Sequence, residues 1–256
     1  MVAAVRANQW VAGGERATES ELDEAVGKVF EYRAYSIVDL YHNIQSHERI
    51  LKTIEFDDSA QEMIERSRRP SEGAVVVIPH VSNYELAGLA TGISGGRGIA
   101  LTEPEQPGGY QHHDRIRKQF GIEAIPASMS SFKYATKVLR EGGIVATGID
   151  RPLAASGYKP TFFGHPAALP VHSVVLALKA KVPIVVGCVN RKANGNYGVS
   201  ATGLIPMKQY ENRKSTILAN AERILEICEQ YISQDPLQWA MFFPVWPDVV
   251  PEPKSE

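Results

Sequence analysis

Residues 75–85 read Val-Val-Val-Ile-Pro-His-Val-Ser-Asn-Tyr-Glu, and this stretch decides how the rest of the chain is interpreted. Four β-branched residues in a row predict a strand that is buried on both faces of a sheet. Ser82 and Asn83, which favour the start of a helix, follow a few positions later. A buried strand that leads directly into a helix is the first half of an α/β unit.

The same alternation continues along the chain. Apolar runs of strand length lie at 74–78, 98–101, 122–125, 144–149, 184–189 and 197–201, the last of them after an Asn-Gly hairpin turn. Helical patterns lie at 22–44, 59–68, 85–91, 110–120, 132–140, 171–180 and 215–231. We therefore expect one α/β domain over residues 21–256, with a mainly parallel, mixed sheet flanked by helices and an N-terminal helical segment. Residues 1–20 are small, polar and aperiodic, and are predicted to form a mobile tail.

Composition excludes several classes of protein. The 256 residues are 44% apolar and 22% charged with a net charge of −2, so the basic excess of a dedicated nucleic-acid binder is missing. Two cysteines, Cys188 and Cys228, are too few for a disulfide scaffold and are expected to be buried. The best apolar stretch, 169–189, is interrupted by two lysines and a proline, and no secretory signal is visible. These features predict a soluble, cytoplasmic chain.

His80 is the first candidate catalytic residue. It follows the carboxyl end of a predicted strand, where open α/β sheets bind their ligands, and Glu85 lies five residues further on. A histidine removes protons near neutral pH when a carboxylate fixes its tautomer and stabilises its charged form. A second interpretation stays open, because Ser82 and Glu85 also have the spacing of a capping box, in which Glu85 bonds only to the helix backbone.

The H-x-x-x-x-E pattern after a hydrophobic strand resembles the first motif of the glycerolipid and lysophospholipid acyltransferase superfamily. Its details are most similar to the bacterial lipid A biosynthesis acyltransferases (lauroyl and myristoyl transferases) and the related mannoside acyltransferases. Four further blocks match in order, so that the resemblance spans roughly residues 25 to 248. They are Asp114–Arg115 to Gly121 with Ile125–Pro126; Gly142 to Asp150; Phe162–Phe163–Gly164–His165–Pro166 with the apolar segments after it; and Gln238–Trp239 with Trp246.

The resemblance implies transfer of a fatty acyl chain from a thioester donor, acyl-CoA or acyl carrier protein, to a hydroxyl of a lipid or glycolipid. By this analogy His80 deprotonates the acceptor hydroxyl and Glu85 orients His80, with no covalent enzyme intermediate, no bound cofactor and no metal. Backbone amides at Ser82 and Asn83, or the Arg115 guanidinium, are the candidates for stabilising the oxyanion. Which lipid accepts the chain, the chain length and the donor are left open by the sequence.

Further substrate-binding candidates come from the other blocks. Asp150 closes a predicted strand and is followed by Arg151, and Phe163 with Gly164 belongs to the segment that shapes the acyl groove in the family. An alternative explains each of them, since Asp150 suits a turn, Phe163 suits a core and Arg115 suits a solvated helix face. The chain also departs from the family pattern, with His165 where relatives usually have Arg or Lys, and with 102–105 reading Thr-Glu-Pro-Glu where Arg-Pro is usual.

Two rival functions remain at this stage. Residues 92–96 satisfy the G-x-S-x-G pattern of serine hydrolases around Ser94, although the motif trails a predicted helix instead of joining a strand to a helix. A non-catalytic lipid-binding module is the other rival. Because a lipid-acylating enzyme must reach a bilayer, we expect peripheral contact with the cytoplasmic face of the inner membrane, through the 22–44 helix or the rim of the acyl groove.

Overall fold

The β-branched segments form a central sheet in a computed structural model that describes residues 1–102, 110–154 and 156–254. Within these residues the sheet has seven strands in the order β1-β9-β8-β2-β5-β3-β4. Their bounds are β1 (Ile54–Phe56), β2 (Ala74–Val77), β3 (Gly98–Thr102), β4 (Glu123–Pro126), β5 (Ile144–Thr147), β8 (Ile184–Arg191) and β9 (Tyr197–Ala201). A separate hairpin pairs β6 (Thr161–Phe162) with β7 (His165–Pro166).

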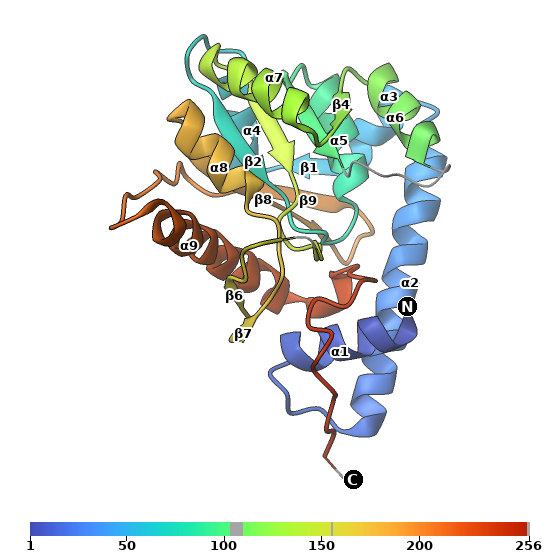
Figure 1. The fold of residues 1–256 in the computed structure, drawn as a ribbon. Coiled ribbons are helices and arrows are strands. Elements are labelled where there is room, and N and C mark those ends of the chain that lie inside the picture. The colour runs from blue at the N-terminus through green and yellow to red at the C-terminus, as the bar shows by residue number, and fades with distance from the viewer. Residues whose placement is uncertain (103–109, 155, 255–256) are drawn as a thin grey trace.

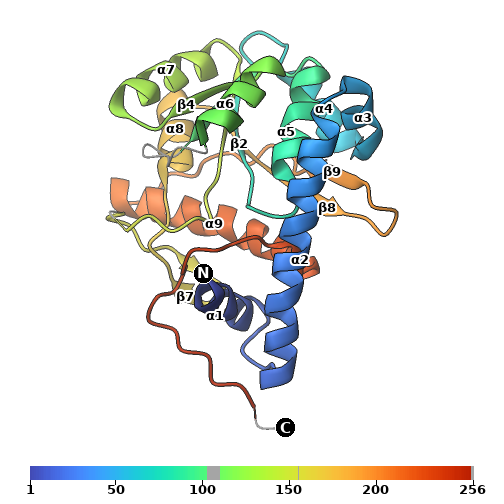
Figure 2. The same ribbon diagram turned by 90° about the vertical axis from the view of Figure 1, so that its right-hand side faces the viewer.

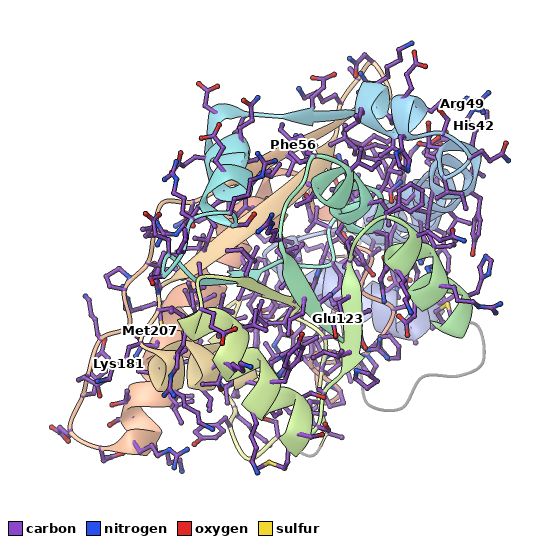
Figure 3. All side chains as sticks on the ribbon, turned by 90° about the horizontal axis from the view of Figure 1, so that it is seen from above. His42, Arg49, Phe56, Glu123, Lys181 and Met207 are labelled. Carbon is purple, nitrogen blue, oxygen red and sulfur yellow. The ribbon has the colours of Figure 1, made fainter. Side chains whose placement is uncertain are left out.

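Strand direction agrees with the predicted mixed sheet. The neighbours from β8 to β4 run parallel, and β9 returns antiparallel to β8 through the expected Asn-Gly turn, with β1 parallel to β9 at the edge. Gly195 has φ of +88° in that turn, a conformation that glycine adopts without strain. Seen from above, Phe56 in β1 and Glu123 in β4 mark the two edge strands (Figure 3).

Helices cover both faces of the sheet, as strand–helix alternation predicts. α7 packs on β5 and β3, α8 on β2 and β8, and α9 on β8, whereas α4, α5 and α6 lie over the opposite side (Figures 1 and 2). The helix bounds are α1 (Val2–Ala12), α2 (Glu19–Asn43), α3 (His47–Thr53), α4 (Asp58–Arg66), α5 (Tyr84–Ile93), α6 (Tyr110–Gln119), α7 (Met129–Arg140), α8 (His172–Ala180), α9 (Arg213–Gln234) and the short 3₁₀ turn η1 (Pro236–Gln238).

The N-terminal residues differ from the prediction of a mobile tail. Residues 2–12 form α1, which packs against α2, η1 and the end of the chain (Figure 2). Asn8 is buried and its amide donates to the carbonyls of Met241 and Phe243, and Trp10 belongs to the main core. The anchoring partners come from the other end of the sequence, so local periodicity gave no sign of them.

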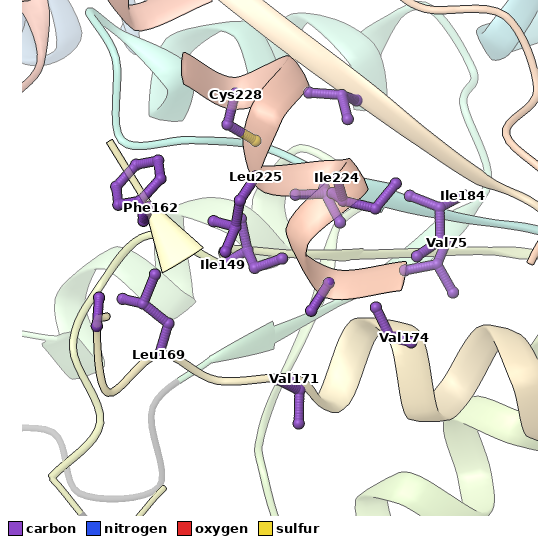
Figure 4. Packing of buried hydrophobic residues seen from close by; sticks show 14 of the residues in the cluster. Val75, Ile149, Phe162, Leu169, Val171, Val174, Ile184, Ile224, Leu225 and Cys228 are labelled. Atoms are coloured by element: carbon purple, nitrogen blue, oxygen red, sulfur yellow. The ribbon is translucent and has the colours of Figure 1, made fainter. Parts of the chain in front are cut away.

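The two faces of the sheet are packed differently. Val75, Val77 and Val145 are fully buried on the side of α7, α8 and α9, where Ile224, Leu225 and Cys228 of α9 meet them in the main core (Figure 4). Alternate residues of the same strands point to the other face and are only partly buried. On this second face the positions are occupied by Val76, Ala100 and Ala146. Their side chains leave a space between the sheet and helices α4 and α5.

Helix α2 follows the amphipathic prediction. Leu22, Val26, Val29 and Leu40 are buried against the domain, and Thr18 with Glu21 forms a capping box at its start. Among the described residues, no helix is both long enough and apolar enough to cross a membrane.

Candidate active site

His80 and Asp150 meet because of the register between two neighbouring strands. β2 and β5 run parallel with Val77 opposite Thr147. His80 lies three residues after Val77, and Asp150 lies three residues after Thr147. The two side chains therefore lie at the carboxyl edge of the sheet, the usual place for ligands in an open α/β fold. His80 Nδ1 and Asp150 Oδ1 are 2.6 Å apart.

Asp150 is held in place by three donors. Its Oδ1 faces the His80 ring, and its Oδ2 accepts from the His80 backbone N–H at 2.8 Å and from the indole N–H of Trp239 at 2.8 Å. The carboxylate is 0% exposed, so it has no free side to offer a substrate. A carboxylate accepts only, so Nδ1 of His80 carries a proton, and in the neutral ring Nε2 keeps a lone pair that can accept another.

The electrostatics favour a charged His80 beside an ionised Asp150. Burial alone lowers the pKa of His80, but the charge of Asp150 and its hydrogen bond outweigh burial and leave the pKa above its ordinary value. Burial alone raises the pKa of Asp150, but the His80 contacts and the Trp239 hydrogen bond lower it below its ordinary value. This pair can accept a proton on Nε2 and stabilise the resulting imidazolium.

The His80 ring is also positioned by packing. Tyr84 meets it edge-on, with ring centroids 5.1 Å apart. On the other side the ring lies against Gly148, where an added Cβ would be only 2.9 Å from His80 Cε1. Glycine at 148 thus allows the ring to sit directly over the end of β5.

Glu85 is not bonded to His80 in the structure, which corrects the expected pairing. The Arg117 guanidinium donates through Nε to Glu85 Oε2 at 3.1 Å and through Nη2 to Glu85 Oε1, and it also donates to Asp114 Oδ1 at 2.9 Å. Both Glu85 and Arg117 are largely buried. The reason is geometric: Glu85 lies in the first turn of α5, and its carboxylate points across to α6.

The capping box at Ser82 and Glu85 is not formed either. Asn83 is the N-cap of α5, with its side chain accepting from the Leu86 N–H. Ser82 is buried with φ of +55°, and its backbone N–H donates to the carbonyl of Gln238 at 2.8 Å. That amide is therefore not available to an oxyanion, contrary to the expectation for Ser82.

A cavity of about 950 Å³ opens beside His80. Glu85, Arg117, Tyr84 and Arg151 also line it, and the volume is at the upper end for small-molecule sites. One limb runs under α4 and α5 across several strands, and its walls are apolar and small. They include Ala60, Met63, Val76, Ala87, Gly88, Ala100, Ala146, Gly187 and Val199.

Phe163 and Gly164 lie elsewhere, which corrects their expected place in the groove. Phe162 is fully buried and stacks on Trp246 with centroids 5.6 Å apart, and Phe163 packs on Phe162 and Trp239. Neither Phe163 nor Gly164 is in the cavity wall formed by the described residues. The aromatic cluster instead supports Trp239, the donor to Asp150.

The two candidate arginines, Arg151 and Arg115, lie in different parts of the structure. Arg151 lines the cavity, with its guanidinium carbon 4.0 Å from the centroid of the Phe243 ring. Arg115 is on the exposed side of α6, outside the part of the cavity wall that the structure describes. Of the departures from the family pattern, Glu103 and Glu105 lie outside the described residues.

The serine-hydrolase motif has the wrong surroundings. Ser94 is the C-cap of α5, after a helix and before β3, as its sequence context indicated. The Asp150 carboxylate is hydrogen-bonded to His80, and His172 is hydrogen-bonded to Thr147, with 2.6 Å between Nε2 and Oγ1. Burial raises the pKa of Cys188 to about 12 and that of Cys228 well above its usual value, so both thiols stay protonated.

Two residues of the site were missed or underestimated by sequence reasoning. Arg117 has no role in the sequence-based prediction, and its spacing of three from Asp114 is the one local sign of an ion pair. Trp239 was noted only as part of a terminal signature, and its contact with Asp150 spans 89 positions. No group of three or more His, Cys, Asp or Glu side chains that could hold a metal occurs among the described residues.

A family model described as bacterial lipid A biosynthesis acyltransferase matches residues 6–247 of the sequence. The chain belongs to the bacterial lipid A biosynthesis acyltransferase family. The matched region contains His80, Asp150, Glu85, Arg117 and Trp239, so the whole site described above lies inside it.

The curated relatives are only distantly similar to this chain in sequence. Proteins named phosphatidylinositol mannoside acyltransferase from two strains of Mycobacterium tuberculosis are each 24% identical over 178 residues, which is 68% of this chain and 54% of the relative. The chain thus spans about half the length of the curated relatives it matches.

Proposed function

We propose that the protein transfers a fatty acyl chain from a thioester, acyl-CoA or acyl carrier protein, to a hydroxyl of a membrane lipid or glycolipid. The observation that carries the proposal is the His80–Asp150 pair at the wall of a large, mostly apolar cavity. Family membership supports acyl transfer to a lipid, and both the family and its mycobacterial relatives are named after glycolipids. Peripheral contact with the cytoplasmic face of the inner membrane belongs to the same proposal.

The chemistry assigned to the site needs no covalent enzyme intermediate. Nε2 of His80 takes the proton of the acceptor hydroxyl while its oxygen attacks the thioester carbonyl. The tetrahedral intermediate then collapses with cleavage of the C–S bond, and the imidazolium returns the proton to the thiolate. Asp150 stabilises the imidazolium throughout, and general-base help of this kind typically contributes about 10²–10⁴ in rate.

The direct test combines donor and acceptor with purified protein. We expect release of free thiol from acyl-CoA or acyl carrier protein that depends on added glycolipid, together with an acylated lipid detected by mass spectrometry. A non-catalytic lipid-binding module would retain bound lipid but release no thiol. Labelling of Ser94 by a fluorophosphonate probe would instead support the hydrolase alternative.

The apolar limb under α4 and α5 is the proposed acyl site, and Gly187 allows its depth to be changed. A Cβ at Gly187 would meet Val76 and Ile78 side chains at 3.7 Å each, an ordinary contact, and would point into the limb. Gly187→Val should therefore fold but shorten the space, lowering kcat/KM for the longest acyl donor by about tenfold or more. Measured across donors of increasing length, the optimum should move to shorter chains.

Gly203→Val is the matched control, because a Cβ at Gly203 meets nothing within 4 Å and Gly203 is outside the cavity wall. Its chain-length profile should equal that of the unaltered protein. An unchanged profile for Gly187→Val would place the acyl chain elsewhere.

Contact with a bilayer is assigned to the outer side of α2. Ile37, Val38 and Tyr41 are exposed there by 41%, 64% and 39%, although they are apolar or aromatic. Tyr41 also adjoins α6, with its hydroxyl 3.4 Å from His113 Nε2, and α6 carries Arg117 of the cavity. This surface thus lies beside the helix that forms part of the cavity wall, where a lipid acceptor would arrive.

Ile37→Asp/Val38→Asp should weaken binding to phospholipid vesicles by about tenfold or more, because two aliphatic side chains no longer enter the bilayer. Vesicle co-sedimentation measures this loss. Leu204→Asp serves as control, since Leu204 is also 47% exposed but is remote in sequence from α2. Equal sedimentation of all three proteins would remove α2 as the contact surface.

A further inference from the structure

A second pocket, of about 370 Å³, lies between α7 and α8 and is rich in positive charge. Three of its residues come from successive turns of α7, namely Lys133, Lys137 and Arg140, and Lys179 faces them from α8. Glu141 is the acidic residue in its described wall. This concentration of cations stands out because the chain as a whole has a net charge of −2.

The cations are arranged at a cost to the fold. Lys133 and Lys137 are four residues apart on one helix face, and like charges at this spacing destabilise a helix. Glu141 relieves only Lys137, at 3.8 Å, and within the described residues Lys133 and Lys179 form no ion pair. The Arg140 guanidinium donates to the Lys179 carbonyl and so holds the two helices together at this end. A bound anion would offset the repulsion.

The basic pocket adjoins the cavity at His80. Thr136 and Lys179 line both, so the large cavity has a second limb that runs between α7 and α8. In this limb the polar side chains of Thr147 and His172, which are hydrogen-bonded to each other, stand among apolar side chains such as those of Phe132 and Val175. Burial lowers the pKa of His172 to about 4, which leaves the ring neutral and able to form hydrogen bonds without adding charge.

We propose that the basic pocket binds the phosphate of a phosphopantetheine thioester, the acyl donor. The inference rests on the proposed function, and it adds the position of the donor's phosphate. Such a donor has an apolar chain, a reactive carbonyl, an arm with amide groups and a phosphate. The cavity and the basic pocket beside it together offer an apolar limb, His80, a limb that contains neutral polar groups and a cluster of cations.

Coenzyme A and acyl carrier protein both carry this phosphopantetheine group, and the test distinguishes them. The variant Lys133→Gln/Lys137→Gln removes two exposed charges without touching the core or the residues near His80. Its affinity for coenzyme A, measured by calorimetry, should fall by about tenfold. Its affinity for pantetheine, which has no phosphate, should not change. Added salt should weaken coenzyme A binding more in the unaltered protein than in the variant.

Lys28→Gln/Lys52→Gln is the matched control, since it removes the same charge from α2 and α3, outside both pockets. Equal coenzyme A affinity in the unaltered protein and the α7 variant would overturn the proposal. So would a loss that extends equally to pantetheine, or a loss only for vesicles with anionic lipid. Where coenzyme A affinity falls, a raised KM for acyl carrier protein as well would assign the pocket to the phosphate that both donors share, and an unchanged KM for acyl carrier protein would assign it to the coenzyme A donor.

These outcomes are separable from failure of the proposed function. Coenzyme A binding is measured without turnover, so it can be lost in the α7 variant whether or not acyl transfer is detected. Absence of transfer with every donor, together with intact coenzyme A binding at the pocket, would contradict the enzymatic proposal but not the presence of a phosphate site.

Discussion

Replacing His80 with alanine is expected to lower the rate of acyl transfer by about 10²–10⁴, the range typical for loss of a general base. Among the described residues that line the cavity, His172 is the one other histidine, and it is hydrogen-bonded to Thr147. Thiol release under saturating donor and acceptor measures the loss.

Two observations keep this result from being confused with misfolding. His80→Ala should bind coenzyme A as the unaltered protein does, because His80 is assigned to the acceptor hydroxyl and lies outside the basic pocket proposed for the phosphate. His112→Ala, an exposed histidine on α6, should leave turnover unchanged. Full activity of His80→Ala would refute the mechanism, whatever the lipid acceptor is.

The pH profile of the unaltered protein is part of the same expectation. His80 must be neutral to accept a proton, so the rate rises as pH rises through the His80 pKa. Because Asp150 holds that pKa above its ordinary value, the acidic limb of the profile should lie at higher pH than for an unperturbed histidine. A limb at lower pH would indicate that burial outweighs the carboxylate.

Sequence reasoning located the sheet and placed His80 at its carboxyl edge, but it did not pair His80 with Asp150. Periodicity and β-branched runs located the strands, and the tip of β2 identified His80, because both are local properties of the chain. Asp150 was singled out only as a substrate-binding residue. Its contact with His80 requires β5 to pair with β2 in a register that brings together two residues 70 positions apart in the sequence. No local pattern of the sequence encodes that pairing.

The two errors around Glu85 and α1 have the same physical origin. Glu85 is close to His80 in sequence, but a helix turn directs its carboxylate to Arg117 on another helix. The first residues looked aperiodic, but Asn8 and Trp10 are fixed by the last segment of the chain. In both cases tertiary contacts override what spacing along the chain suggests.

Asp150→Asn is expected to reduce turnover by about 10³–10⁴, close to the effect of losing the orienting acid in a serine-protease triad. An asparagine has one acceptor oxygen where aspartate has two. If its NH₂ took the place of Oδ2, it would face the His80 backbone N–H and the Trp239 indole N–H, leaving two buried donors unpaired. Its NH₂ should therefore replace Oδ1 and donate to Nδ1.

That arrangement forces the wrong tautomer on His80. With Nδ1 accepting from asparagine, the ring proton moves to Nε2, and Nε2 can no longer take a proton from the acceptor hydroxyl. Loss of the negative charge also lowers the His80 pKa, so the remaining activity should have its acidic limb at lower pH. Steady-state rates across pH measure both changes at once.

Glu85→Gln separates this assignment from the alternative in which Glu85 orients His80. The substitution weakens the bond to Arg117 but leaves the Asp150 contacts intact. We therefore expect a smaller loss of turnover than for Asp150→Asn and a smaller movement of the acidic limb to lower pH, because the Glu85 charge raises the His80 pKa less than the Asp150 contacts do. A loss of turnover and a displacement of the limb both as large as those of Asp150→Asn would return the orienting role to Glu85. The pH limb is the decisive readout, because a merely structural disturbance lowers the rate without changing the tautomer or the pKa of the base.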